Sequence, residues 1–445
     1  MRIYLIQPTI NRWQISYREK PSVGFARSIL NRSSPVRFGG GNKLPPLALL
    51  TIAALTPPEY QVTIVDEEVE RLDYGLEADL VGIGILTTNA YRGYEIARRF
   101  RERGVRVVFG GVHATVLPEE AARHGDAVVI GEAEGVWDRV LADAGNGILK
   151  PFYRAEALCD MKDMPHPRRD LVSAENYIST NIIQITRGCP NSCSFCSVHA
   201  VAGRKYRFRP VEEVMAEIDT FDHPLVLIHD DNIVGDPEYA RELFRAMIPR
   251  KVTWVSQASL NVATDPELLD LAVRSGMKVV LIGFESVYEE NIRSMGKSGT
   301  NRVAGYREAI RKLRSRGVCV SGTFILGLEN DGPGVFRQTA DFIRESGLGA
   351  PLAGVLTPYP GSTLFTRMDR EGRLIHTDWS RYSHTMGDVV FRPNRMTPEE
   401  LEAGYRFVGR EIFSMTSLAR RLAANRKALL PTLGWNFRKR RVFYQ

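Results

Sequence analysis

The chain has 445 residues, 44% of them hydrophobic and 25% charged, and its formal net charge is +7. This composition is typical of a globular protein with two or three domains, and it excludes a disordered or fibrous chain. The basic excess lies between Ile412 and Gln445, where eight Lys or Arg residues occur without any Asp or Glu. The body of the protein therefore gives no charge signal for nucleic-acid binding.

Residues 1–150 alternate short β-branched runs with helical patterns. Strands are predicted at 2–9, 61–68, 78–88, 105–111 and 126–132, and helices at 45–55, 90–104 and 118–125. This alternation predicts an α/β domain with a Rossmann-like, doubly wound parallel sheet, whose ligand crevice lies at the carboxyl ends of the strands. Small or polar residues stand at four of these ends, in the segments QPT, TTN, GGVHAT and GEAEG.

A second strand–helix alternation follows an irregular, Pro-containing segment, 151–176, which we interpret as a linker. Its strands are predicted at 181–186, 225–231, 252–259, 278–286, 318–327 and 349–361, and its helices near 211–220, 237–248, 265–275, 302–316 and 334–346. Six strands are too few for an eight-stranded barrel. We therefore expect a partial (β/α)6 TIM-like barrel over 177–370, with its active site at the carboxyl ends of the strands. A mostly helical extension with a basic tail is predicted over 371–445.

The sequence predicts a cytoplasmic protein. The longest aliphatic run, which starts at Leu44, is too short to span a bilayer and contains two prolines. The opening residues are typical of a strand and not of a cleavable leader. Three of the five cysteines are clustered, which argues against a disulfide framework and for a reducing compartment.

The clustered cysteines, Cys189, Cys193 and Cys196, follow the first predicted barrel strand in the spacing C-x3-C-x2-C. Together with His199 they fit a closed tetrahedral zinc site, and without it they fit an iron–sulfur cluster that lacks one protein ligand. Structural zinc usually staples a domain with little core through two separated ligand pairs. This domain has an ample core and no second pair. The position at the catalytic edge also favours an open site.

The segment CPNSCSFC resembles the cysteine loop of the radical S-adenosylmethionine (SAM) superfamily, with Phe195 as the aromatic residue before the last cysteine. Five later segments resemble the superfamily in the same order: HDDN (229–232), SQAS (256–259), GFES (283–286), GTFILGLEND (322–331) and TPYPGSTL (357–364). The resemblance implies that the three cysteines bind three irons of a 4Fe–4S cluster and that SAM takes the fourth. An electron from the cluster would then cleave SAM to a 5′-deoxyadenosyl radical.

The same resemblance implies a SAM site at the strand ends. The residues expected to contact SAM or to admit it to the backbone are Asp230, Asp231, Asn232, Gln257, Ser259, Glu285, Gly322 and Gly327. The first three are expected at the methionine amino group and the next three at the ribose or methionyl part. The two glycines are expected beside the adenine. For each polar residue, the alternative is a cap of its strand end or a contact one shell away from the ligand.

The first domain resembles the cobalamin-binding domain that precedes the barrel in one radical SAM subfamily, through LPPLALLTIAAL, the strand end at Asp66 and Glu67, GGVHAT and GEAEG. The implied cobalamin site includes Thr87, Thr88, Asn89, Gly110, Gly111, Val112, His113, Gly131 and Glu132. None of the eight histidines has Asp two positions before it, so the motif that gives cobalt a histidine ligand is absent. We expect base-off cobalamin without a histidine ligand, and His113 as a loop residue.

Residues 387–414 resemble the C-terminal extension of bacterial members of this subfamily. The following residues, 417–430, carry leucines at helical spacing with basic residues between them. This pattern predicts a helix that covers the barrel, and peripheral contact with an anionic membrane is the alternative.

The predicted function is a cobalamin-dependent radical SAM methyltransferase acting on an unactivated carbon or phosphorus centre. The expected partners are a small-molecule or lipid-like substrate and an external electron donor of the flavodoxin or ferredoxin type. One alternative uses the same cofactors for cyclisation, ring contraction or 3-amino-3-carboxypropyl transfer. Another is a cobalamin sensor whose cysteines hold zinc.

Overall fold

The computed structural model describes residues 1–10 and 43–444. Its contacts divide the chain into two compact units, and each unit is described by itself. Unit 1 comprises Met1–Ile183, Ser197–Gly203 and Ala216–Leu225, and unit 2 comprises Gln184–Cys196, Arg204–Met215 and Val226–Gln445. In the described part of the chain, no helix has both the length and the apolar character that crossing a membrane requires.

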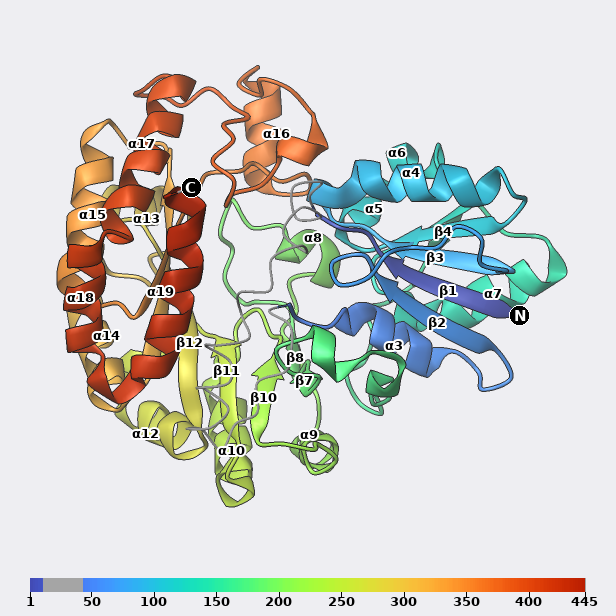
Figure 1. Ribbon diagram of the computed structural model, residues 1–445, viewed down its shortest axis with the longest axis horizontal. Helices are drawn as coiled ribbons and strands as arrows, with labels where there is room; N and C mark the ends of the chain where they lie inside the picture. The colour runs from blue at the N-terminus through green and yellow to red at the C-terminus, as the bar shows by residue number, and fades with distance from the viewer. Residues whose placement is uncertain (11–42, 445) are drawn as a thin grey trace. The chain divides into compact units, whose positions relative to one another are not determined.

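Unit 1 contains a six-stranded sheet in the order β2-β1-β3-β4-β5-β6, with all neighbours parallel. The strands are β1 (Arg2–Gln7), β2 (Gln61–Asp66), β3 (Leu80–Gly84), β4 (Arg106–Gly110), β5 (Ala127–Ile130) and β6 (Phe152–Arg154). Helices cover both faces (Figure 1): α4 (Ala90–Arg101), α5 (Val112–Val116) and α6 (Pro118–Ala122) on one, α3 (Leu47–Leu55) and α7 (Trp137–Asn146) on the other. The predicted doubly wound sheet is confirmed.

Each face of this sheet has its own apolar core, because the strands are buried on both sides. Leu50 of α3 and Trp137 of α7 belong to one core, and Ile96 and Phe100 of α4 belong to the other. Helix α7 and strand β6 were not predicted, and β6 lies inside the expected linker, where it pairs with β5. A three-residue strand is too short to show an alternating pattern.

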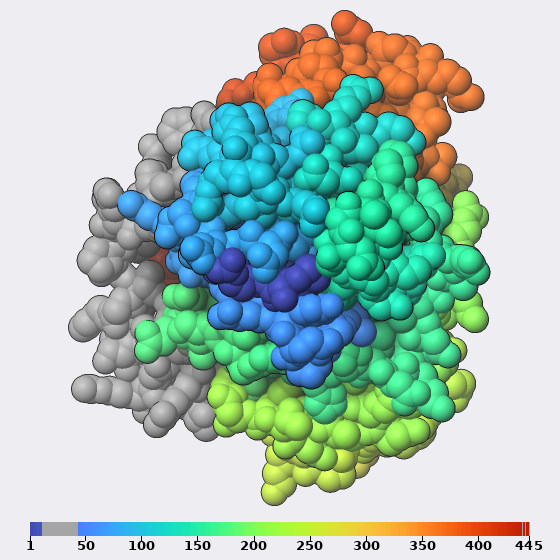
Figure 2. Space-filling model, turned by 90° about the vertical axis from the view of Figure 1, so that its right-hand side faces the viewer, coloured from blue at the N-terminus to red at the C-terminus, as the bar shows by residue number. Residues whose placement is uncertain are grey.

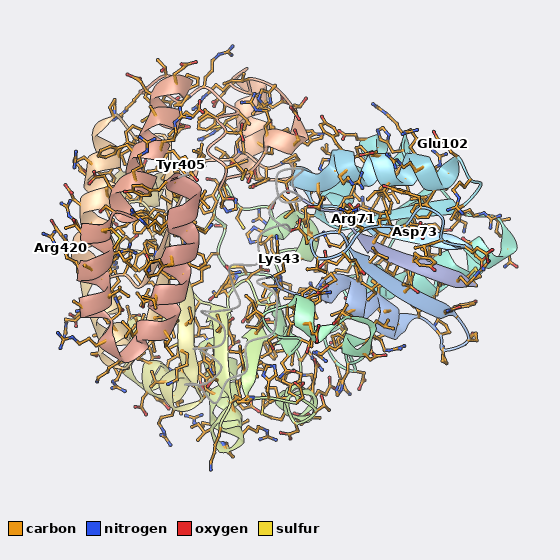
Figure 3. All side chains as sticks on the ribbon, viewed as in Figure 1. Lys43, Arg71, Asp73, Glu102, Tyr405 and Arg420 are labelled. Atoms are coloured by element: carbon orange, nitrogen blue, oxygen red, sulfur yellow. The ribbon has the colours of Figure 1, made fainter. Side chains whose placement is uncertain are left out.

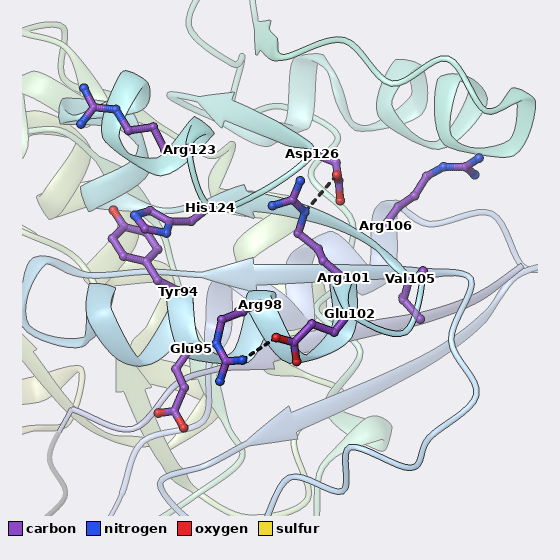
Figure 4. Close-up of a pocket in the computed structure, with 11 residues that line it drawn as sticks. Tyr94, Glu95, Arg98, Arg101, Glu102, Val105, Arg106, Arg123, His124 and Asp126 are labelled. Carbon is purple, nitrogen blue, oxygen red and sulfur yellow. Dashed lines mark hydrogen bonds and ion pairs between the residues drawn. The ribbon is translucent and has the colours of Figure 1, made fainter.

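The amino-terminal ends of the strands lie opposite their carboxyl ends, and parallel sheets bind ligands at the carboxyl ends. Arg2 is exposed there, and Figure 2 shows the first residues of β1, in dark blue, at the surface. A cavity of about 720 Å³ opens beside the starts of β4 and β5 (Figure 4), between the ion pairs Arg98–Glu102 and Arg101–Asp126. Its position makes it a poor candidate for the cofactor site.

The second sheet has the order β14-β13-β12-β11-β10-β7. Its strands are β7 (Ile182–Ile183), β10 (Leu225–Ile228), β11 (Thr253–Gln257), β12 (Met277–Glu285), β13 (Cys319–Leu326) and β14 (Ala350–Val355). Strands β11 to β14 pair in parallel, and helices follow the strands: α9 (Val211–Ile218), α10 (Pro237–Met247), α12 (Pro266–Arg274), α14 (Tyr306–Ser315) and α15 (Gly334–Ser346). Strands that are neighbours in the sheet thus come from successive strand–helix segments of the chain. The predicted partial barrel is confirmed.

Two predicted strands of the barrel were too long. The strand expected over 181–186 contributes only β7 to the barrel, because β8 (Thr186–Arg187) turns away to pair antiparallel with β9 (Arg207–Phe208). The strand expected over 349–361 ends at Val355, and the Pro-rich residues that follow form a loop before α16 (Thr363–Arg370). Proline lacks the N–H that a ladder needs, which explains this end.

The C-terminal helices are α17 (Pro398–Ile412), α18 (Met415–Ala424) and α19 (Leu429–Phe443). The predicted mostly helical extension is confirmed, but the helix expected over 417–430 is interrupted after Ala424 and α19 begins at Leu429. Helices α17 and α19 contact β14, and the Trp435 indole N–H donates to the Pro351 carbonyl at 3.0 Å. These contacts cover the edge strand, which would otherwise expose unpaired backbone groups. Arg420 is exposed on α18 (Figure 3), whereas Arg421 is fully buried and donates to the Ile412 carbonyl.

Candidate active site

The carboxylate of Asp230 fixes the start of the cysteine loop, which we define as residues 188–196. Asp230 follows β10, is almost completely buried, and accepts hydrogen bonds from Ile185 N at 2.8 Å, Thr186 N at 3.0 Å and Thr186 Oγ1 at 2.9 Å. Burial raises its pKa to about 7, although the three donors favour the charged form. Asp230 therefore positions the loop, and its contact with SAM stays a prediction.

The middle of the loop is tied to two other strand–helix connections. Ser194 N donates to the Met295 carbonyl, after α13 (Glu289–Ser294), at 3.1 Å, and the Ser194 carbonyl accepts from Leu364 N of α16 at 2.8 Å. All three cysteines of the loop are half-buried, and none forms a disulfide. Burial raises the pKa of the Cys189 and Cys193 thiols, and the charge of Lys297 opposes this effect at both. Binding iron there would release protons.

A strained residue ends β12 next to the loop. Glu285 has φ +65°, and the register between β12 and β13 shifts between Gly283 and Glu285. The carboxylate of Glu285 forms an ion pair with Lys297, whose ammonium also donates to the Gly283 carbonyl at 3.0 Å. Burial alone would lower the pKa of Lys297, but the charge of Glu285 outweighs it, so this pKa is raised. Lys297 was not predicted, because it belongs to no strand-end motif.

The ends of β10 and β11 are joined by an amide. Asn232 is buried, and its Oδ1 accepts from Ser259 N at 2.8 Å. The Ser259 hydroxyl is buried and has no hydrogen-bond partner among the described residues, which is unusual unless a ligand or water supplies one. Gln257 and Asp231 are exposed at the same edge. Ser259 is thus the polar side chain here that most needs a ligand.

Gly322 and Gly327 both have structural reasons to be glycine. A Cβ at Gly322 would lie 2.8 Å from Cδ2 of Leu348, inside the core. Gly327 has φ +91°, and its N–H donates to Asp331 Oδ2 at 3.0 Å. Asp331 also accepts from Asn291 Nδ2 at 2.7 Å, and this bond ties the ends of β12 and β13 together. Approach of adenine to the two glycines stays a prediction.

In unit 1, the strand order reverses between β1 and β3, and such a switch point is where doubly wound sheets bind ligands. Asn89 bridges the two strand ends. Its Nδ2 donates to the Pro8 carbonyl at 2.9 Å, and its Oδ1 accepts from Leu86 N at 2.7 Å. Thr87 is buried, Thr88 is half-buried and Leu86 is exposed. The buried amide joins the two strand ends, and Leu86 is an exposed apolar side chain beside it.

His113 lies in α5 and is fully buried. Its Nδ1 is 3.4 Å from Thr87 Oγ1, and its Nε2 is 3.3 Å from Glu120 Oε1. Both ring nitrogens therefore have protein partners. The expectation of a loop residue was wrong about its position, because the histidine is part of a helix that packs inside unit 1.

The glycines at the ends of β4 and β5 leave room for a ligand. Cβ atoms built at Gly110 and Gly131 would meet nothing within 4 Å. Gly111 differs, because its φ is +94° and a Cβ there would lie 2.7 Å from the Ile85 carbonyl oxygen. Val112 and Glu132 are half-buried, and Glu132 Oε2 accepts from Cys159 N at 2.7 Å.

Comparisons with known proteins identify the family. The model of the radical SAM superfamily matches residues 183–343, and that of the B12 binding domain matches residues 38–141. A bacteriochlorophyllide d C-12(1)-methyltransferase from Chlorobaculum tepidum is 32% identical over 389 residues, which cover 85% of this chain and 84% of that protein. The chain belongs to the cobalamin-dependent radical SAM methyltransferases. The predicted class of enzyme is confirmed.

Solved structures agree with this fold. The radical SAM methyltransferase TsrM from Kitasatospora setae, with cobalamin and a [4Fe-4S] cluster bound, superposes with a TM-score of 0.65 at 15% identity, over 91% of this chain and 81% of that one. The cobalamin-dependent SAM radical enzyme OxsB, with aqua-cobalamin and SAM bound, gives 0.67 at 14% identity, over 100% and 72%. At such low sequence identity, these superpositions are evidence for the fold of this methyltransferase and for nothing beyond the fold.

The residues of this methyltransferase fit its family's cofactors. Three thiols on one loop suit a cluster that keeps one iron open, since each thiolate binds a different iron. In the part of the chain described, no three His, Cys, Asp or Glu side chains are arranged around a single metal ion. The unpartnered Ser259 hydroxyl fits a SAM contact, and the open Cβ positions of Gly110 and Gly131 fit the approach of cobalamin to the backbone.

Two adjacent glycines give a matched test of unit 1. Gly111→Ala should destabilise the protein by about 2 kcal/mol or more, since the substitution combines a left-handed φ with a clash against backbone. Gly110→Ala should melt like the parent chain, because its Cβ meets open space, and it should weaken cobalamin binding. Thermal melting and cobalamin titration of both variants provide the measurement. Equal melting of the two variants would contradict the described turn.

The cysteine loop is tested by comparing Cys196→Ala with His199→Ala. The first variant should lose the cluster, because only two thiolates remain, and the second should keep it, because His199 is not needed as a ligand. Iron and sulfide analysis after anaerobic reconstitution gives the answer. Loss of metal from His199→Ala, or stoichiometric zinc in the parent chain, would restore the zinc interpretation.

Proposed function

We propose that this methyltransferase adds a methyl group to an unactivated carbon of a tetrapyrrole. The relative that carries this proposal is named for C-12(1) of bacteriochlorophyllide d, and the similarity extends over 85% of this chain. When bound, the cluster supplies the electron that turns SAM into a hydrogen-abstracting radical, and cobalamin carries the methyl group. One SAM molecule would be used for the radical and a second for the methyl group.

The chain's own residues have distinct roles in this proposal. Cys189, Cys193 and Cys196 hold the cluster and leave one iron for SAM. The Ser259 hydroxyl donates to SAM, because burial leaves it without another partner. Glu285 contacts SAM while Lys297 holds its carboxylate in place. These assignments extend the predicted site by one residue, Lys297.

Cobalamin binds base-off and without a histidine ligand in this proposal. Enclosure of His113 between Thr87 and Glu120 supports it, because a buried histidine with two protein partners does not reach a ligand. The exposed Leu86 at the β3 end would offer an apolar surface to bound cobalamin. The lack of a histidine ligand would favour transfer of the methyl group to a substrate radical.

The proposal also includes an electron-donor protein, a cytoplasmic location and a membrane contact. A flavodoxin- or ferredoxin-type protein in the cytoplasm delivers the electron. The C-terminal region makes a peripheral contact with an anionic membrane. Arg420 and Arg426 are exposed there together with Leu429, Leu430 and Phe437, and this combination supports attraction to an anionic surface.

Product analysis tests the function directly. The chain should be reconstituted anaerobically with iron, sulfide and cobalamin, and then supplied with SAM, a reductant and a bacteriochlorophyllide. S-adenosylhomocysteine and 5′-deoxyadenosine should form in equal amounts, together with a methylated pigment. Without cobalamin, S-adenosylhomocysteine and the methylated pigment should both be absent.

Other product patterns would contradict methyl transfer. If 5′-deoxyadenosine formed without S-adenosylhomocysteine, the enzyme would catalyse a rearrangement or cyclisation. Formation of methylthioadenosine would indicate 3-amino-3-carboxypropyl transfer instead.

A further inference from the structure

A tyrosine and a histidine form a pair beyond the end of β14, apart from the residues assigned above. Tyr359 lies in the loop between β14 and α16, and His384 lies after the 3-10 turn Trp379–Arg381. The Tyr359 hydroxyl oxygen is 3.1 Å from His384 Nδ1, and the two rings meet edge to face with centroids 6.4 Å apart. The pair therefore has a defined geometry.

The backbone fixes His384 at the catalytic edge of the sheet. The His384 carbonyl accepts from Val355 N, the last residue of β14, at 2.9 Å. A Cβ at Gly354 would lie 2.7 Å from the same carbonyl oxygen, so this stretch of chain runs closely against the edge strand. The carboxyl ends of barrel strands are where substrates bind. His384 thus lies at the substrate end of the barrel.

The imidazole of His384 is accessible, and its surroundings favour the neutral form. His384 is exposed, yet the protein crowded around it lowers its pKa, and the charge of Lys439 adds to this effect while that of Glu285 opposes it. Burial raises the pKa of the Tyr359 phenol, so the hydroxyl keeps its proton at neutral pH. Nδ1 faces Tyr359, and within the described residues no hydrogen bond reaches Nε2. Nε2 is therefore available to a ligand.

We propose that His384 Nε2 binds the central magnesium ion of a tetrapyrrole substrate as its axial ligand, with Tyr359 orienting the ring. A metal-binding histidine typically donates its other N–H to an oxygen that fixes its tautomer and orientation. The Tyr359 oxygen can accept from Nδ1–H, which leaves the lone pair on Nε2 for the metal. Four ring nitrogens leave the magnesium of such a pigment with an axial position for a neutral donor. The inference rests on the proposed tetrapyrrole substrate.

Binding of two porphyrins that differ only in the metal tests this inference. The full chain should be titrated with magnesium protoporphyrin IX and with metal-free protoporphyrin IX, by absorption spectroscopy. The magnesium pigment should bind more tightly and show the band shift of axial nitrogen ligation. His384→Ala should weaken its binding about tenfold or more and leave the metal-free pigment unchanged. Free imidazole should restore the band shift in this variant.

Two further variants separate ligation from a structural effect. Tyr359→Phe should weaken binding of the magnesium pigment to a smaller extent, because it removes only the oxygen that orients the ring. His124→Ala should change nothing, since His124 is an exposed histidine in unit 1 at the edge away from the cofactor crevice.

The outcomes distinguish this inference from the proposed function. If His384→Ala bound both pigments like the parent chain, the axial ligand would be excluded and the tetrapyrrole substrate would stand. If the parent chain bound neither pigment, the tetrapyrrole substrate itself would be excluded, and His384 would lose this role with it.

Discussion

The fold of unit 2 depends on how the cysteine loop is held at the carboxyl edge of a parallel sheet. Asp230 binds the backbone of Ile185 and Thr186 just before the loop, and Ser194 within it binds Met295 and Leu364. These bonds connect the loop to the end of β10, to the residue after α13 and to the start of α16. Three cysteines therefore lie on one anchored loop at the carboxyl edge of the sheet, and the loop itself contains no fourth His, Cys, Asp or Glu.

Buried carboxylates lie near the ends of β10, β12 and β13, and each has a specific compensation. Asp230 accepts from backbone donors, Asp331 accepts from Gly327, Leu328 and Asn291, and Glu285 is paired with Lys297. Uncompensated, each would cost several kcal/mol. The left-handed backbone conformation of Glu285 has a separate conformational cost of about 1–3 kcal/mol. Hydrogen bonds from Asn301 and Tyr306 to the carbonyls of residues 283 and 284 help to maintain it, which is the pattern expected of a functional strand end.

The sequence was sufficient for the class of fold, and the role of the three cysteines as cluster ligands stays a prediction. Continuous β-branched runs predict buried parallel strands, and the spacing C-x3-C-x2-C predicts a metal-binding loop without any knowledge of contacts. The misses have physical reasons. Strand β6 has only three residues, so it shows no period, and Thr186–Arg187 leaves the barrel to pair with a strand about 20 residues later. The local sequence pattern indicates neither the short strand β6 nor the pairing of β8 with β9.

The roles of single polar residues were harder to predict than the positions of the strands and helices. The expected contact of Asp230 with SAM stays a prediction. The structure adds a role in holding the backbone, because the carboxylate accepts from amides 44 and 45 residues earlier in the chain, and a sequence does not show this pairing. Lys297 and His384 follow no motif, and their partners become visible only when strand ends meet. The basic tail also divides differently in the fold, since adjacent Arg420 and Arg421 are exposed and buried, respectively.

The central claim is that the cysteine loop leaves one iron of the cluster open for SAM. Mössbauer spectroscopy of the chain reconstituted with iron-57, recorded before and after addition of SAM, tests it most directly. The account predicts that one iron of the cluster changes its isomer shift on addition of SAM while the others keep theirs. A spectrum that SAM leaves unchanged, with all four irons equivalent, would contradict it.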